Sequence, residues 1–274
     1  MHQPTQSAKS WTLDNVPYGD VDPSMVRDQE HLFYLVTAAS FIEIAADLYT
    51  DNLIQYFDGD QEVVDWLENK WKPEEVRHGY ALRDYVAHVW PGFDWQAAYD
   101  GFFQEYSRMC TVDEFEPSRC LEMVARCVVE TGTSTFYQAM SQLTEEPVLA
   151  GIVARIRADE VGHYKYFYRF FRQYSATEPP GRIKILAALK RRMIEARNDD
   201  AECALRHAYA IRCRQGDPGF SSFKELMSTL GAQVKRHYPV DMAAKMLIKP
   251  LDLPRALARL LQGPVATATK KIML

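Results

Sequence analysis

The spacing of hydrophobic and polar residues is helical over most of the chain. Apolar residues recur every three or four positions, whereas the alternation typical of strands is scarce. We therefore expect an all-α fold. The predicted helices cover residues 26–57, 61–89, 94–109, 117–144, 146–174, 182–197, 200–213 and 219–237.

Turn and proline signals divide this helical chain. Residues 1–25 contain three prolines and are expected to form an irregular arm, and the stretch 175–181, with two adjacent prolines, is the clearest break. We predict a single domain, in which 26–174 form a helical bundle and the helices of 182–274 pack on it. Pro73 lies inside the second predicted helix, where it should bend or interrupt the helix.

Two ExxH motifs lie on apolar helix faces. One joins Glu75 to His78, and the other joins Glu160 to His163. In each predicted helix the motif residues continue a series of apolar residues spaced by three and four positions. A carboxylate buried on such a face is unfavourable unless it is paired or bound to a cation.

Each motif is preceded by a helix with one glutamate on its apolar face, Glu43 or Glu130. Glu75 follows Glu43 by 32 residues and Glu160 follows Glu130 by 30, which indicates a duplicated helix pair. Four carboxylates and two imidazoles suit two iron or manganese ions, with two bridging glutamates and one histidine and one terminal carboxylate on each metal. This pattern is typical of ferritin-like di-iron carboxylate bundles, so we expect a ferritin-like four-helix core with additional C-terminal helices.

A structural role is the main alternative for these residues. A buried ExxH can form ion pairs, and Glu43 could pair with an arginine. The presence of all six residues on four apolar stripes favours the metal site. His31, His88 and His207 are interpreted as ordinary helical histidines.

Composition and charge limit the class of protein. A hydrophobic fraction of 47% and a charged fraction of 25% are typical of a globular protein. A net charge of -5 offers no basic excess for nucleic acid. The chain has no run of 18 apolar residues and no apolar core of a secretory signal, so we expect neither a transmembrane segment nor export. Five cysteines without CxxC spacing are expected to be reduced thiols in a cytoplasmic protein.

Two segments resemble the soluble acyl-carrier-protein desaturases. Residues 71–86, WKPEEVRHGYALRDYV, resemble the first iron-binding motif of that family, and residues 145–167, EEPVLAGIVARIRADEVGHYKYF, resemble the second. Together with the two single glutamates, the resemblance covers roughly 26–174. It implies a di-iron centre whose ligands are Glu43, Glu75, His78, Glu130, Glu160 and His163.

The resemblance also implies roles for two neighbouring residues. Thr133 matches a threonine beside the oxygen-binding face, which predicts a catalytic role, although a hydroxyl bonded only to its own helix remains the alternative. Asp159 matches an aspartate that holds the first histidine. Leu82 stands where ribonucleotide reductase small subunits have a radical tyrosine, and Ile156 stands where the di-iron amine N-oxygenases add a histidine. Both positions favour the desaturases over these related families.

The activity that the resemblance implies is oxygen-dependent desaturation. Two iron ions, or manganese in their place, would introduce a cis double bond into an acyl chain bound to acyl carrier protein. Because the chain has no nucleotide-binding glycine motif, electrons must come from a partner such as a ferredoxin. The alternatives are a di-iron hydroxylase or N-oxygenase acting on a small molecule, and a non-catalytic iron-binding ferritin-like protein. A homodimer is expected.

The densest basic stretch, residues 181–197, is a candidate docking surface for the acidic carrier. We expect its apolar residues to pack on the bundle, while Lys190, Arg191 and Arg192 face the carrier. A solvated helix face without a partner is the alternative. The apolar residues of this segment are Ile183, Leu186, Ala187 and Met193.

Overall fold

The computed structural model describes residues 11–110, 115–195 and 199–272. No strand occurs in this part of the chain, so the prediction of an all-α fold is confirmed. The helices are α1 (Glu30–Tyr56), α2 (Gln61–Trp66), α3 (Lys72–Val89), α4 (Trp95–Tyr106), α5 (Arg119–Met140), α6 (Pro147–Thr177), α7 (Arg182–Glu195), α8 (Asp199–Arg214), α9 (Phe223–His237), α10 (Val240–Ile248) and α11 (Arg255–Ile272).

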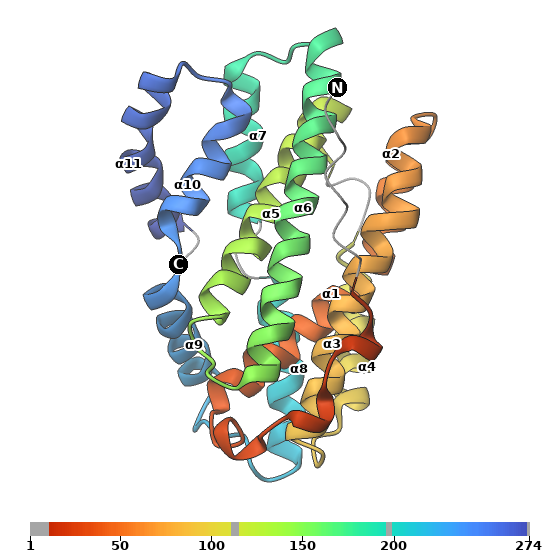
Figure 1. Ribbon diagram of the computed structural model, residues 1–274, viewed down its shortest axis with the longest axis vertical. Helices are drawn as coiled ribbons and strands as arrows, with labels where there is room; N and C mark the ends of the chain where they lie inside the picture. The colour runs from red at the N-terminus through yellow and green to blue at the C-terminus, as the bar shows by residue number, and fades with distance from the viewer. Residues whose placement is uncertain (1–10, 111–114, 196–198, 273–274) are drawn as a thin grey trace.

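Four long helices form a ferritin-like bundle at the centre of the molecule. α1 packs along α3, α5 packs along α6, and α3 also meets α6, which joins the two pairs (Figure 1). The other helices surround this bundle. α8 packs on α1 and α4, while α7, α9 and α10 pack on α5, and α11 packs on α10.

Side-chain caps fix where the bundle helices begin. Asp60 caps α2 and Ser118 caps α5, at the points where turn residues give way to apolar stripes. Glu146 caps α6 by accepting two of its backbone N–H groups, and it also accepts the hydroxyl of Tyr85 on α3. This fully buried carboxylate therefore joins the start of α6 to α3.

The interruption predicted at Pro73 is confirmed. A π-helical turn, Leu67–Trp71, separates α2 from α3, and Pro73 lies in the first turn of α3. Proline has no N–H to donate, so the regular hydrogen bonding of the helix cannot pass through it. A wider π turn shifts which residues face the bundle, and the Trp71 side chain reaches Glu130 on α5.

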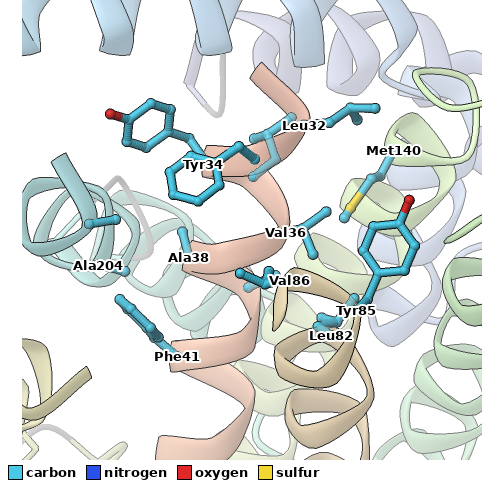
Figure 2. Close-up of a cluster of buried hydrophobic side chains, with 14 of the residues drawn as sticks. Leu32, Tyr34, Val36, Ala38, Phe41, Leu82, Tyr85, Val86, Met140 and Ala204 are labelled. Carbon is cyan, nitrogen blue, oxygen red and sulfur yellow. The ribbon is translucent and has the colours of Figure 1, made fainter. Parts of the chain in front are cut away.

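Buried apolar side chains form two clusters at opposite ends of the bundle. The first contains the early part of α1, the later part of α3 and α8, as Figure 2 shows. The second contains the end of α1, α2, the start of α5 and the end of α6. In α3, α5 and α6 the predicted metal ligands lie where one cluster gives way to the other, and in α1 Glu43 lies near the end of the first cluster.

α1 is long and apolar enough to cross a membrane by length and composition alone, which the sequence analysis did not expect. In the structure 72% of its most apolar window is buried. This burial is typical of a core helix that faces other helices on several sides. Glu43 lies on this helix and is itself buried.

The prediction for the packing face of α7 is only partly right, because Met193 is buried as predicted but Ile183 and Leu186 are not. Ile183 and Leu186 are 86% and 58% exposed, whereas Ile185, Leu189 and Met193 are buried. Both sets of residues have helical spacing, so periodicity alone could not choose between them. Contacts with the second apolar cluster decide which face is buried.

The cations of the predicted docking helix are also arranged differently. Arg191 donates to Glu116 at 3.1 Å, although its side chain is still 48% exposed, whereas Arg192 is only 9% exposed. Docking of a carrier on α7 stays a prediction. Lys190 remains exposed. The end of the predicted helix, including Arg197, lies outside the described residues.

Candidate metal centre

The structure brings the six predicted ligands together at the middle of the bundle. One glutamate comes from each of α1 and α5, and one ExxH pair comes from each of α3 and α6. None of the six is more than 7% exposed. They are Glu43, Glu75, His78, Glu130, Glu160 and His163.

These side chains form two overlapping groups. Glu75 and Glu160 belong to both groups; Glu43 and His78 complete one, and Glu130 and His163 complete the other. Within each group, one ligand atom per residue lies within 4.8 Å of the others. In such a site the shared glutamates would bridge two metal ions, and Glu43 and Glu130 would each be a terminal ligand.

Each of the six side chains has one buried atom without a hydrogen-bond partner in the described part of the chain. Nδ1 of His163 lies 2.9 Å from Oε1 of Glu75, and Nδ1 of His78 lies 3.1 Å from Oε1 of Glu160, but neither contact has hydrogen-bond geometry. Buried polar atoms are rarely left unpaired, so these residues fit metal ions well. The atoms are Glu43 Oε2, Glu75 Oε1, His78 Nδ1, Glu130 Oε2, Glu160 Oε1 and His163 Nδ1.

A carboxylate outside the ligand set holds each histidine. Nε2 of His78 lies 3.0 Å from Asp159, and Nε2 of His163 lies 3.1 Å from Glu74. When Nε2–H donates to these carboxylates, the lone pair of Nδ1 is free for a metal. Sequence reasoning missed Glu74, although the signal was present. An acidic residue directly precedes the ExxH glutamate in both motifs: Glu74 before Glu75 and Asp159 before Glu160. Only Asp159 was expected to hold a histidine.

Asp159 and Glu74, the two carboxylates that hold the histidines, are paired with cations outside the ligand set. Arg77 donates to Asp159 at 2.9 Å and lies 3.4 Å from Glu74, which is also paired with Lys70. Trp11 of the N-terminal arm donates its indole N–H to Asp159 at 2.8 Å. The four ligand carboxylates therefore remain to balance two divalent cations.

Each terminal carboxylate receives one hydrogen bond from an aromatic side chain. The hydroxyl of Tyr137 donates to Oε1 of Glu43, and the indole of Trp71 donates to Oε1 of Glu130 at 3.2 Å. In both residues the other oxygen, Oε2, is left without a partner. This arrangement favours monodentate binding through Oε2.

Crowding of charge shifts the pKa values of the ligands. Burial, together with the charges of Glu160 and Glu43, raises the pKa of Glu75 to about 8. Burial and the charge of Glu160 likewise raise the pKa of Glu130. Burial opposes charge on His78 too, but its hydrogen bond with Asp159 and the nearby charge of Glu43 raise its pKa well above the usual range. Without metal, the site thus holds protons that metal ions would displace.

A comparison with known protein families fits this geometry. The family model described as fatty acid desaturase matches residues 55–238. The chain belongs to this family. As a desaturase it is an oxidoreductase. No curated protein matches the desaturase chain.

The match includes both ExxH motifs, Glu130 and Thr133, but begins after Glu43. Glu43 is thus placed in the desaturase site by the fold rather than by the match. The match also continues past residue 174, where the resemblance seen in the sequence ended, into the C-terminal helices.

Thr133 of the desaturase lies beside a bridging ligand. Its hydroxyl is 2.8 Å from Oε2 of Glu160, and it lies 3.3 and 3.4 Å from two carbonyl oxygens of α5. The single hydroxyl proton is best placed to bond the ligand. The catalytic role of Thr133 stays a prediction.

A third group of side chains that could bind a metal ion lies outside this centre. It consists of Glu105, Cys203 and His207. Arg206 donates two hydrogen bonds to Glu105, at 2.8 and 3.0 Å. These bonds and one from His207 lower the pKa of Glu105 to about 2. The carboxylate already has a cationic partner, so this group is an ion-pair cluster on α4 and α8.

Proposed function

We propose that this desaturase is a di-iron enzyme that uses dioxygen to introduce a cis double bond into an acyl chain presented by acyl carrier protein. The observation that carries the proposal is the set of six buried ligand atoms without hydrogen-bond partners. Four carboxylates and two imidazoles suit iron or manganese, and oxidation by dioxygen favours iron.

The overall reaction balances with an external donor. The acyl chain loses one hydrogen from each of two adjacent methylenes, and dioxygen with two electrons and two protons becomes two waters. Bound iron supplies the redox chemistry of oxygen activation. The chain has no nucleotide-binding glycine motif, so a one-electron carrier such as a ferredoxin is the proposed donor. A cytoplasmic homodimer completes the proposal.

The protein's own side chains orient the ligands and exclude water. Asp159 and Glu74 hold the histidine Nε2–H groups, so that Nδ1 of each ring would be free to bind a metal ion. Burial of the ligands keeps bulk water from the reactive site. The hydroxyl of Thr133 can hold or deliver a proton at Oε2 of Glu160.

Mass spectrometry of the product tests the proposal. Iron-loaded protein, reduced ferredoxin and stearoyl-carrier thioester should yield an acyl chain lighter by two hydrogens. The His163→Ala variant, which lacks a ligand, is the control. A chain heavier by one oxygen would instead identify a hydroxylase. Oxidation of ferrous iron unaffected by the acyl substrate would identify an iron-binding ferritin-like protein.

Replacing Thr133 by valine tests its role in that reaction. The variant should keep both irons but consume several oxygen molecules for each double bond, because the proton held at Glu160 is lost. Thr131→Val is the matched control, since the Thr131 hydroxyl bonds only the Cys127 carbonyl of its own helix, at 2.6 Å. Oxygen and product that remain equal in the Thr133 variant would assign this hydroxyl a structural role.

A further inference from the structure

A pocket of about 310 Å³ lies between the end of α10 and the start of α11. Tyr168 on α6 forms one wall, and apolar residues of α10 and α11 line part of the remainder. The connection from α10 to α11 lies at the same end of the molecule as the connection from α6 to α7 (Figure 1). Arg182 at the start of α7 donates to the carbonyl oxygens of Leu251 and Asp252 in that connection.

The pocket carries a surplus of positive charge. Lys245, Lys249 and Arg259 line it, and none of them forms an ion pair with an acid in the described part of the chain. The one acidic lining residue, Asp252, is already bound by Arg172 at 2.8 Å. The ammonium of Lys249 lies 4.4 Å from the ring centroid of Tyr168, so its stem is held against that wall.

The pocket is connected to the metal centre through α10 and α6. Tyr164, the residue after His163, donates its hydroxyl to the Met246 carbonyl of α10 at 2.6 Å. The sulfur of Met246 lies 3.8 Å from the hydroxyl of Ser134, the residue after Thr133. α10 therefore contacts both α5 and α6 near the predicted ligands, and the pocket lies at the C-terminal end of α10.

We infer that this pocket binds the phosphate group of the prosthetic arm that carries the acyl chain. The inference rests on the proposed function. An acyl carrier holds its acyl group as a thioester at the end of a phosphopantetheine arm, so one phosphodiester lies at a fixed separation from the chain. Three cations, with the amide of Gln262 beside them, suit a phosphate, and the apolar lining suits the arm.

The pocket and the predicted metal ligands share α6. Tyr168 follows His163 by five residues, which corresponds to about 8 Å along the axis of α6. The cations of this pocket lack an acidic partner in the described part of the chain, whereas Arg191 of α7 is paired with Glu116 and Arg192 is buried.

Binding of the isolated arm tests the inference without any turnover. Calorimetry with 4′-phosphopantetheine and with pantetheine, which lacks only the phosphate, should show at least tenfold tighter binding of the phosphorylated compound. The Lys245→Glu/Arg259→Glu variant should lose this preference. Lys224→Glu, an exposed change on α9, is the matched control and should retain it. Equal binding of the two compounds by the unchanged protein, or no binding, would overturn the inference.

Steady-state kinetics with the stearoyl carrier separates the possible sources of the phosphate. We expect the pocket variant to raise KM at least tenfold and to leave kcat and iron content unchanged, and Lys245→Arg alone to retain a normal KM. Faster turnover of stearoyl-coenzyme A than of stearoyl carrier would overturn the carrier as the source. A normal KM in the pocket variant, with a raised KM in Lys184→Glu/Lys190→Glu, would assign docking to α7 instead.

These results also distinguish failure of the inference from failure of the proposed function. Desaturation of the carrier-bound chain with an unchanged KM in the pocket variant would refute the phosphate site alone. Phosphate-dependent binding of the arm without any desaturated product would refute the proposed function and leave the phosphate site standing.

Discussion

The two halves of the metal centre have the same ligands but different surroundings. α1 supplies Glu43 and α3 supplies the first ExxH pair. In the same way, α5 supplies Glu130 and α6 supplies the second ExxH pair. Three residues after the terminal glutamate, however, the first half has Ala46 and the second has Thr133. A hydroxyl at a bridging ligand therefore exists on one side only, where it donates to Glu160.

The supports of the two histidines differ in exposure. Asp159 has a side chain 22% exposed and is covered by Trp11 from the N-terminal arm. Glu74 has a side chain only 6% exposed and lies within the bundle. The two halves thus share the ligands that a metal would need, but differ in the side chains around those ligands. The comparison suggests that one half is held by the bundle and the other partly by the arm.

Loss of either ligand histidine should have the largest effect. Purified wild-type protein should hold about two metal ions per chain, as expected for this ligand pattern. His78→Ala and His163→Ala should each lose most of the bound metal, because both metals share bridging carboxylates. Elemental analysis measures this, with His207→Ala, outside the site, as the control. Full metal content in either variant would refute the assignment.

Removal of the outer carboxylate charge should have the next largest effect. Asp159→Asn and Glu74→Gln should each weaken binding of one metal by roughly 10- to 100-fold, since the histidine loses its fixed orientation. Competition with a chelator measures the affinity, and Asp84→Asn on α3 is a control outside the site. If the internal support is stronger, Glu74→Gln will have the greater effect. A wild-type affinity in both variants would contradict the proposed role of these carboxylates.

Matched glycine substitutions compare the packing of the two helix pairs. A methyl group at Gly79 would lie 2.7 Å from the backbone nitrogen of Ile44 and 2.9 Å from the carbonyl of Ser40, so α3 needs glycine there to approach α1. Gly79→Ala should lower the free energy of unfolding by about 1–3 kcal/mol. A methyl group at Gly162 on α6 would meet nothing within 4 Å. Gly162→Ala should be neutral or stabilise by up to about 1 kcal/mol.

Denaturant unfolding of both glycine variants measures this difference. Comparable destabilisation of the two proteins would show that the close approach of α1 and α3 is not specific to that pair.

The two tryptophans that donate to acidic residues should have the smallest effects, and unequal ones. Trp71→Phe leaves the buried carboxylate of Glu130 without a partner, which should cost about 1–3 kcal/mol in the metal-free protein. Trp11→Phe removes a bond to the partly exposed Asp159, and we expect about 1 kcal/mol or less. Thermal unfolding compares them, and a larger loss from Trp11→Phe would reverse the assignment of the arm as the weaker support.

Much of the site could be read from the sequence because helical periodicity is a local property. Spacings of three and four residues placed Glu43, Glu75, Glu130 and Glu160 on apolar faces, and buried acids there required partners. The same periodicity could not select the buried face of α7, where Ile183 and Ile185 begin two alternative stripes of similar quality. It also could not show that Arg191 would be bound by Glu116, 75 residues away.

The amino-acid sequence by itself determined the class of fold, the approximate positions of the bundle helices, the six candidate ligands and the family. Each of these depends on residue types at short, regular spacings, which can be recognised in the sequence before the packing of the helices is known. Only the tertiary structure decided which glutamates are shared by the two ligand groups, which aromatic side chain bonds Glu43 and which bonds Glu130, and where cations without an acidic partner gather beside α10 and α11. These features depend on side chains from distant segments, such as Trp11 and Asp159, and their proximity is set by how whole helices pack.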